Sequence, residues 1–176
     1  MQQAILTEVD AGVGIITLNC PERHNAFDDV LISELTQAID AMTQDAAVRV
    51  IVLSSNGKSF CAGADLNWMR RAANYSDAEN LRDARALADM LRCLAQCPKP
   101  TIARVQGPAY AGGVGLVACC DIVIAVFDAQ FSLPEVRIGI VPATISPYVI
   151  SVIGERHARR YMLTAERFSA AVAYRM

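Results

Sequence analysis

The chain has 176 residues, of which 53% are hydrophobic and 19% charged, and its formal net charge is −2. This composition is typical of a folded globular protein, excludes a disordered chain, and gives no electrostatic basis for binding nucleic acid or an anionic membrane surface. No apolar run reaches the roughly 18 residues of a membrane-spanning helix, and the first residues do not resemble a secretory signal. The six cysteines follow no zinc-ligand spacing. We therefore expect a cytoplasmic protein with free thiols and no metal.

Strands and helices alternate along the chain, which predicts the α/β class. The predicted strands are 4–9, 13–19, 48–54, 101–105, 121–126 and 130–132. The predicted helices are 28–44, a long helix that begins at the capping box of Ser76 and Glu79 and ends near Pro98, a short one from Gly112 to about Cys120, 149–163 with a break at Gly154, and a helical start at Glu166. The strand, long helix and strand between 48 and 105 form a unit that implies parallel pairing.

Two glycine-containing turns are the most informative feature of the sequence. They span 59–66 and 106–116, and each joins a β-branched apolar run to a stretch with helical character. Such a turn points free backbone N–H groups into a crevice. Two turns side by side can hold one oxygen that carries developing negative charge, and Ala64 and Gly112 are placed to donate to it. Alternatively, the glycines serve only to permit the two turns.

Glu135 is the main candidate for proton transfer. Carboxylates are sparse in the second half of the chain, and Glu135 has apolar residues on both sides. An apolar environment raises the pKa of a carboxyl group and suits a general acid or base, although an exposed loop glutamate fits the sequence equally well. The two histidines, His24 and His157, have no nucleophile at a recognisable spacing, which indicates surface or ligand-contact residues.

These segments together resemble the crotonase, or enoyl-CoA hydratase/isomerase, superfamily. The resemblance covers one domain, residues 1–176, and rests on motifs in a shared order: 21–26, 60–66, 99–103, 107–113, 120–122, 131–135 and 139–142. It implies a crotonase-like spiral of ββα units, acyl-CoA substrates, and homotrimers or hexamers. The segments 142–149, 154–156 and 159–161 look like a narrower branch of bacterial methylglutaconyl-CoA and γ-carboxygeranoyl-CoA hydratase-like proteins, which points to fatty acid, branched-chain amino acid or isoprenoid metabolism.

The resemblance also assigns roles by position. The N–H groups of Ala64 and Gly112 would hold the thioester oxygen, and Glu135 would transfer the proton. The other implied CoA-binding residues are Ala62, Asp65 and Leu66 along the adenine and pantetheine path, and Arg23 near the CoA phosphates. Coenzyme A is part of the substrate, so no separate cofactor is expected.

The sequence departs from the family pattern in two ways. Hydratases of the two-glutamate type carry their other glutamate where this chain has Gly115. The resemblance also implies that family members continue into further C-terminal helices, so we expect that this sequence lacks that C-terminal helical part. The leading hypothesis is a hydratase that adds water to an α,β-unsaturated acyl-CoA. The alternatives are an enoyl-CoA isomerase that uses a single glutamate, and a non-catalytic or truncated acyl-CoA-binding protein.

Overall fold

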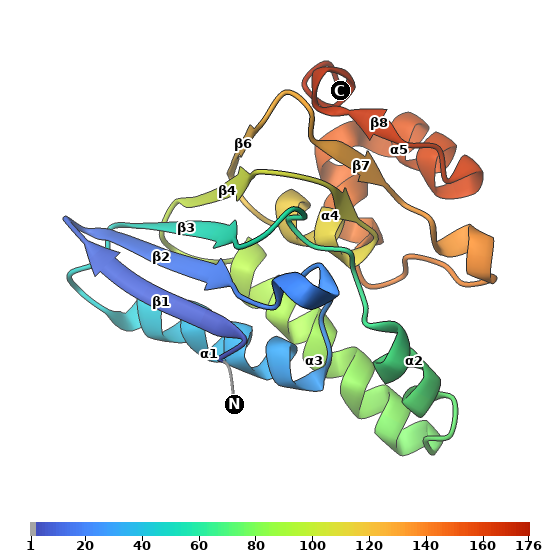
Figure 1. Cartoon of the computed structure of the whole chain (residues 1–176), viewed down its shortest axis with the longest axis horizontal. Helices are drawn as coiled ribbons and strands as arrows, with labels where there is room; N and C mark the ends of the chain where they lie inside the picture. The colour runs from blue at the N-terminus through green and yellow to red at the C-terminus, as the bar shows by residue number, and fades with distance from the viewer. Residues whose placement is uncertain (1–2) are drawn as a thin grey trace.

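The computed structural model describes residues 3–176 and contains two β-sheets with helices packed against them (Figure 1). The larger sheet has the strand order β1-β2-β3-β4-β6. Its strands are β1 (Ile5–Asp10), β2 (Val13–Leu18), β3 (Val50–Ser55), β4 (Thr101–Val105) and β6 (Ile122–Ala125). β1 and β2 form an antiparallel hairpin, and every later pair in this sheet is parallel. The predicted parallel pairing of β3 and β4 is therefore confirmed.

Two long helices, α1 (Asp29–Gln44) and α3 (Asp77–Ala95), lie on one face of the larger sheet (Figure 1). In α1, Leu31, Leu35 and Ile39 recur every four residues and are buried, as the hydrophobic spacing predicts. The capping box at the start of α3 is confirmed, because the Ser76 hydroxyl accepts the Glu79 N–H and the Glu79 carboxylate accepts the Ser76 N–H.

The smaller sheet has the order β5-β7-β8 and lies with the C-terminal helices at the other end of the molecule (Figure 1). Its short strands are β5 (Ala109–Tyr110), β7 (Gln130–Ser132) and β8 (Phe168–Ser169). The remaining elements are the 3-10 turns η1 (Pro21–Arg23) and η2 (Glu135–Ile138) and the helices α2 (Leu66–Ala72), α4 (Gly112–Ala118), α5 (Ser146–Thr164) and α6 (Ala170–Ala173).

Two sequence predictions near the C-terminus have different outcomes. The break at Gly154 is confirmed, because this residue has a φ of 75° and a ψ of 158° inside α5. The helical start at Glu166 is wrong, because the chain first forms β8 and becomes helical only at Ala170. The Phe168 ring, buried at 5.5 Å from the Phe131 ring and 4.3 Å from the Tyr161 ring, accounts for the extended segment.

Candidate active site

The two glycine turns lie side by side because β3 and β4 are parallel neighbours. Parallel strands end at the same edge of a sheet, so the segments that follow them leave together. Phe60 donates its N–H to the Pro108 carbonyl (2.9 Å), and Tyr110 donates its N–H to the Cys61 carbonyl (2.9 Å). The contact between the turns is close at Gly63, where an added β-carbon would lie 2.7 Å from Ala111 Cβ and 3.3 Å from the Gly112 nitrogen.

Ala64 and Gly112 present unpaired N–H groups in these adjacent turns. Phe27 forms a parallel bridge with Ala64, in which Phe27 N–H donates to Gly63 O (2.8 Å) and Asp65 N–H donates to Phe27 O (2.9 Å). The N–H of Ala64 therefore points away from Phe27, and it donates no hydrogen bond within residues 3–176. In the same part of the chain, the N–H of Gly112 at the start of α4 also donates none.

The backbone beside Gly112 is strained. Ala111 has a φ of 49° and a ψ of −122°, a conformation that residues with a side chain rarely adopt. Such a residue costs of the order of 1–3 kcal/mol and persists where its surroundings determine it. Its N–H donates to the Ser132 carbonyl on β7 (2.9 Å), and its carbonyl accepts the Val114 N–H (2.9 Å). These bonds fix the peptide that carries the Gly112 N–H.

A buried polar cluster that the sequence reasoning missed supports the first turn. Asn25 has a φ of 54°, accepts the Cys20 N–H at its side-chain oxygen, and donates its amide to the carbonyls of Asn56 and Ser59. Burial raises the pKa of the Cys61 thiol to about 12, so the thiol stays neutral and donates to the Asn25 carbonyl (3.1 Å). The sequence signal that pointed to this cluster was the polar motif 21–26, which contains Asn25. A fully buried asparagine requires hydrogen-bond partners inside the protein.

Glu135 is the first residue of η2. It follows shortly after Ser132, the last residue of β7, whose carbonyl accepts the Ala111 N–H. It is only 7% exposed, and its Oε2 atom has no hydrogen-bond partner among the described residues. Burial raises the pKa of its carboxyl group above the ordinary value of 4.5. Of the two interpretations that the sequence left open, the structure excludes an exposed loop glutamate. A buried carboxyl group with a free oxygen and a raised pKa suits proton transfer.

The implied CoA-binding residues of the first turn differ in exposure, and Asp65 is buried. Leu66 is 62% exposed, and the half-buried Ala62 donates its N–H to the His24 carbonyl (3.0 Å). The Asp65 carboxylate caps α2 by accepting the N–H groups of Asn67 and Trp68 (2.8 and 2.9 Å). This carboxylate is therefore engaged inside the protein.

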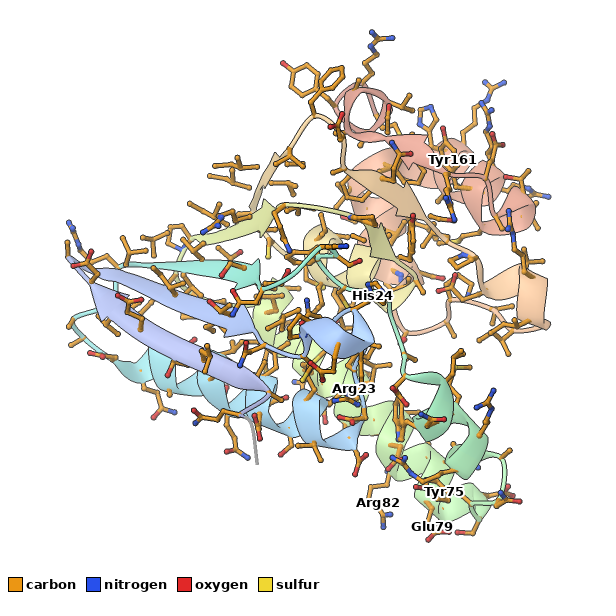
Figure 2. The ribbon with its side chains drawn as sticks, viewed as in Figure 1. Arg23, His24, Tyr75, Glu79, Arg82 and Tyr161 are labelled. Carbon is orange, nitrogen blue, oxygen red and sulfur yellow. The ribbon has the colours of Figure 1, made fainter. Side chains whose placement is uncertain are left out.

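Arg23, at the end of η1, lies near the middle of the molecule and below His24 in the view of Figure 2. Its Nη1 atom is 2.7 Å from Asp28 Oδ2 and 3.6 Å from Asp65 Oδ2. The structure thus places the Arg23 guanidinium between the N-caps of α1 and α2. The Nδ1 atom of His24, the neighbour of Arg23, lies 2.9 Å from the Ser59 hydroxyl oxygen.

Gly115 lies in α4 against an apolar wall, without space for a side chain. A β-carbon on Gly115 would overlap the Cγ2 atom of Ile145 and lie 2.9 Å from its Cβ. Ile145 is buried, and Leu91 of α3 lies beside it. The space beside Gly115 is thus filled by an isoleucine side chain from another part of the chain.

Among residues 3–176, no helix combines the length and the hydropathy that crossing a membrane requires. Over the same residues, no three or more His, Cys, Asp or Glu side chains are grouped closely enough to hold a metal ion.

The comparison with family models decides the classification. The model of the enoyl-CoA hydratase/isomerase family matches residues 8–176. The chain belongs to this family. The chain also has the α/β architecture of a solved crotonase structure, so the fold class expected from the sequence is confirmed.

Individual relatives agree with this assignment. A crystal structure of an enoyl-CoA hydratase from Shewanella pealeana superposes with a TM-score of 0.95 at 46% identity, covering 98% of this chain and 65% of that one. "Enoyl-CoA hydratase AKT6-1" of Alternaria alternata is 41% identical over 89% of this chain and 51% of its own length. "Enoyl-CoA hydratase, mitochondrial" of Pongo abelii is 38% identical over 90% of this chain and 53% of its own length. The family member described here thus spans about half the length of these two curated relatives.

Proposed function

We propose that this chain carries the site of an enoyl-CoA hydratase, which adds water across the α,β double bond of an acyl-CoA thioester. The observation that carries the proposal is the pair of unpaired N–H groups on Ala64 and Gly112, in turns that pack against each other. During hydration, negative charge develops on the thioester oxygen. Two donors fixed before the charge appears stabilise it without further reorganisation. The names of the relatives support an enoyl-CoA as the substrate class.

In the proposed reaction, Glu135 performs both proton transfers. The ionised carboxylate takes a proton from water as the water oxygen bonds to the β-carbon, and the electron pair of the double bond moves onto the thioester oxygen. The protonated Glu135 then returns the proton to the α-carbon, and the enolate collapses to the 3-hydroxyacyl thioester. Atoms and charge balance with one carboxylate and no redox cofactor. The raised pKa and the free Oε2 atom of Glu135 support this role.

The CoA part of the substrate is proposed to follow the outer side of the first turn, past Ala62, Asp65 and Leu66. The exposed Leu66 side chain supports this path, since it offers an apolar surface to an adenine ring. The proposal places Arg23 near the CoA phosphates as well, although its ion pairs with Asp28 and Asp65 give it a competing structural task.

Isomerisation is the second candidate function, and the Gly115 position favours it. Because Ile145 fills the space beside Gly115, Glu135 has no second carboxylate there to share the activation of water. One glutamate is sufficient to move a proton between two carbons of an enoyl chain. The narrower methylglutaconyl-CoA and γ-carboxygeranoyl-CoA hydratase-like branch, which looks to have glycine at this position too, is the reason to keep hydration first.

Mass spectrometry of the protein incubated with a panel of enoyl-CoA thioesters tests the proposal. The panel includes crotonyl-CoA and methylglutaconyl-CoA, and the expected product is heavier than the substrate by one water. A product of unchanged mass with a moved double bond would establish the isomerase instead. Bound thioester without any turnover would establish the non-catalytic acyl-CoA-binding protein and contradict both enzymatic readings.

A homotrimer or hexamer remains our proposal for the assembly. Its support is an apolar surface on and near β6, where Ile122 and Ile124 are exposed and Phe127 is 82% exposed. Large exposed apolar areas are a feature of interaction surfaces. Light scattering across a range of protein concentrations would measure the mass, and a monomer at all concentrations would contradict the proposal.

A further inference from the structure

We propose that Phe27, held in register by Arg23, is a positioning residue that sets the distance between the two N–H donors of the candidate oxyanion hole. The inference rests on the proposed function and assigns a task to two residues outside the reacting groups. Its basis is that Phe27 contacts both donor segments at once, through its backbone on one side and its ring on the other.

The backbone of Phe27 fixes the first donor segment. Its N–H and its carbonyl bind Gly63 and Asp65, the two neighbours of Ala64, at 2.8 and 2.9 Å. These two bonds hold the peptides on both sides of Ala64 and direct its N–H to the opposite side. A displacement of the Phe27 backbone would therefore displace the Ala64 N–H with it.

The ring of Phe27 supports the second donor segment. Phe27 is 1% exposed, and the far edge of its ring lies beneath Gly112. A β-carbon on Gly112 would overlap the Cζ atom of Phe27 and lie 2.8 Å from Cε2 and 3.2 Å from Cε1. The length of a phenylalanine side chain thus separates the Ala64 bridge from the start of α4.

Arg23 links the same two segments through ion pairs with two aspartates. Its guanidinium binds Asp28 at 2.7 Å and reaches Asp65 at 3.6 Å, and these aspartates directly follow Phe27 and Ala64. The hydrogen bond to Asp28 raises the pKa of Arg23. Burial opposes ionisation of Asp28, but the Leu31 N–H and the Arg23 guanidinium outweigh it and lower the pKa of this carboxyl group. The ion pair between Arg23 and Asp28 therefore persists at neutral pH. Through Asp28 and Asp65, Arg23 contacts the residues that directly follow Phe27 and Ala64, the two partners of the β-bridge.

The required tolerance explains why such support matters. An oxyanion hole stabilises charge when both donors lie about 2.7–3.1 Å from the oxygen. A catalytic constellation works only when it is held within about 0.5 Å of its productive geometry. The side chain of leucine ends at Cδ, so the ring atoms that contact Gly112 have no counterpart in a Phe27→Leu variant.

The test measures the oxyanion hole directly with cinnamoyl-CoA, whose absorption moves to longer wavelength when donors polarise its carbonyl, and measures turnover with crotonyl-CoA. In Phe27→Leu we expect kcat to fall about ten- to a hundredfold, the scale for an ångström-sized misplacement. We expect a reduced spectral shift and a KM close to that of the unmodified protein. Phe27→Met, which retains an atom at the ε position, is expected to recover part of the shift.

The matched control is Phe168→Leu, which truncates another buried phenylalanine that contacts Phe131 and Tyr161. It is expected to lower thermal stability but to keep the spectral shift and kcat. An unchanged shift in Phe27→Leu, or an equal loss of the shift in Phe168→Leu, would overturn the inference.

Arg23 provides a second test that does not alter the core. Arg23→Gln is expected to reduce kcat and the spectral shift, with partial rescue in Arg23→Lys. A raised KM with an unchanged shift would instead show that Arg23 binds the CoA phosphates and would overturn its positioning role. If the unmodified protein neither shifts the cinnamoyl-CoA spectrum nor turns over crotonyl-CoA, the proposed function itself fails; if it does both, only the variants decide the inference.

Discussion

Replacing Glu135 by glutamine should change activity and stability in opposite directions. The two side chains have nearly the same shape, but glutamine neither accepts nor returns a proton at neutral pH. General acid–base catalysis by a positioned side chain contributes about 10²–10⁴-fold to a rate, so we expect kcat for crotonyl-CoA to fall by that factor in Glu135→Gln. Binding of the CoA thioester should remain, because the two N–H donors are unaffected.

The effect on stability follows from the raised pKa of the buried carboxyl group. Between the ordinary value of 4.5 and the higher native pKa, the folded protein retains a proton that the unfolded chain has released. The unfolding free energy of the unmodified protein therefore falls as the pH rises through this window and levels off above the native pKa. The variant lacks this decline, so its stability relative to the unmodified protein should rise by about 1.4 kcal/mol for each unit by which the native pKa is raised.

Two assays check this reasoning. Urea unfolding of both proteins between pH 4 and pH 9 should show the relative stability of Glu135→Gln increasing with pH and becoming constant above the native pKa. In the unmodified protein, kcat/KM should increase with pH through the same pKa, because the carboxylate must be ionised to accept a proton. A variant with full activity, or a stability difference that does not depend on pH, would refute the assignment of Glu135.

Three further substitutions separate the site from the scaffold. Gly112→Ala should lower kcat about 10²–10³-fold, as for a lost oxyanion donor, because the new β-carbon would overlap the Phe27 ring; kinetics with crotonyl-CoA measure this, and an unchanged kcat would contradict it. Gly115→Glu should reduce the unfolding free energy by at least about 1–3 kcal/mol through overlap with Ile145. Combining it with Ile145→Ala should recover part of that loss in urea unfolding. If Gly115→Glu alone were as stable as the unmodified protein, the residues around Gly115 would have moved to make space for the new side chain. Ser76→Ala should cost about 1 kcal/mol of stability by removing the capping box while kcat stays unchanged, and a loss of activity would show that α3 is coupled to the site.

The sequence alone determined features that depend on neighbouring residues. The apolar spacing of Leu31, Leu35 and Ile39 specified α1, and the Ser76–Glu79 pair specified the start of α3. Hydrophobic periodicity and capping are local, so they can be read in a window of one or two turns. The glycine turns are local in the same sense. The parallel relation of β3 and β4 was predictable for another reason, because a long connection that contains a helix is typical of parallel strands.

Only the tertiary structure decided what the site residues touch. Burial of Glu135, the position of Phe27 between two donor segments, and the packing of Ile145 against Gly115 all join residues from separate parts of the chain. Likewise, the helix start predicted at Glu166 is a local interpretation, whereas aromatic packing of Phe168 across the fold decides the conformation of this segment. Side-chain contacts over such separations depend on how the strands and helices pack, and no local pattern in the sequence records that packing.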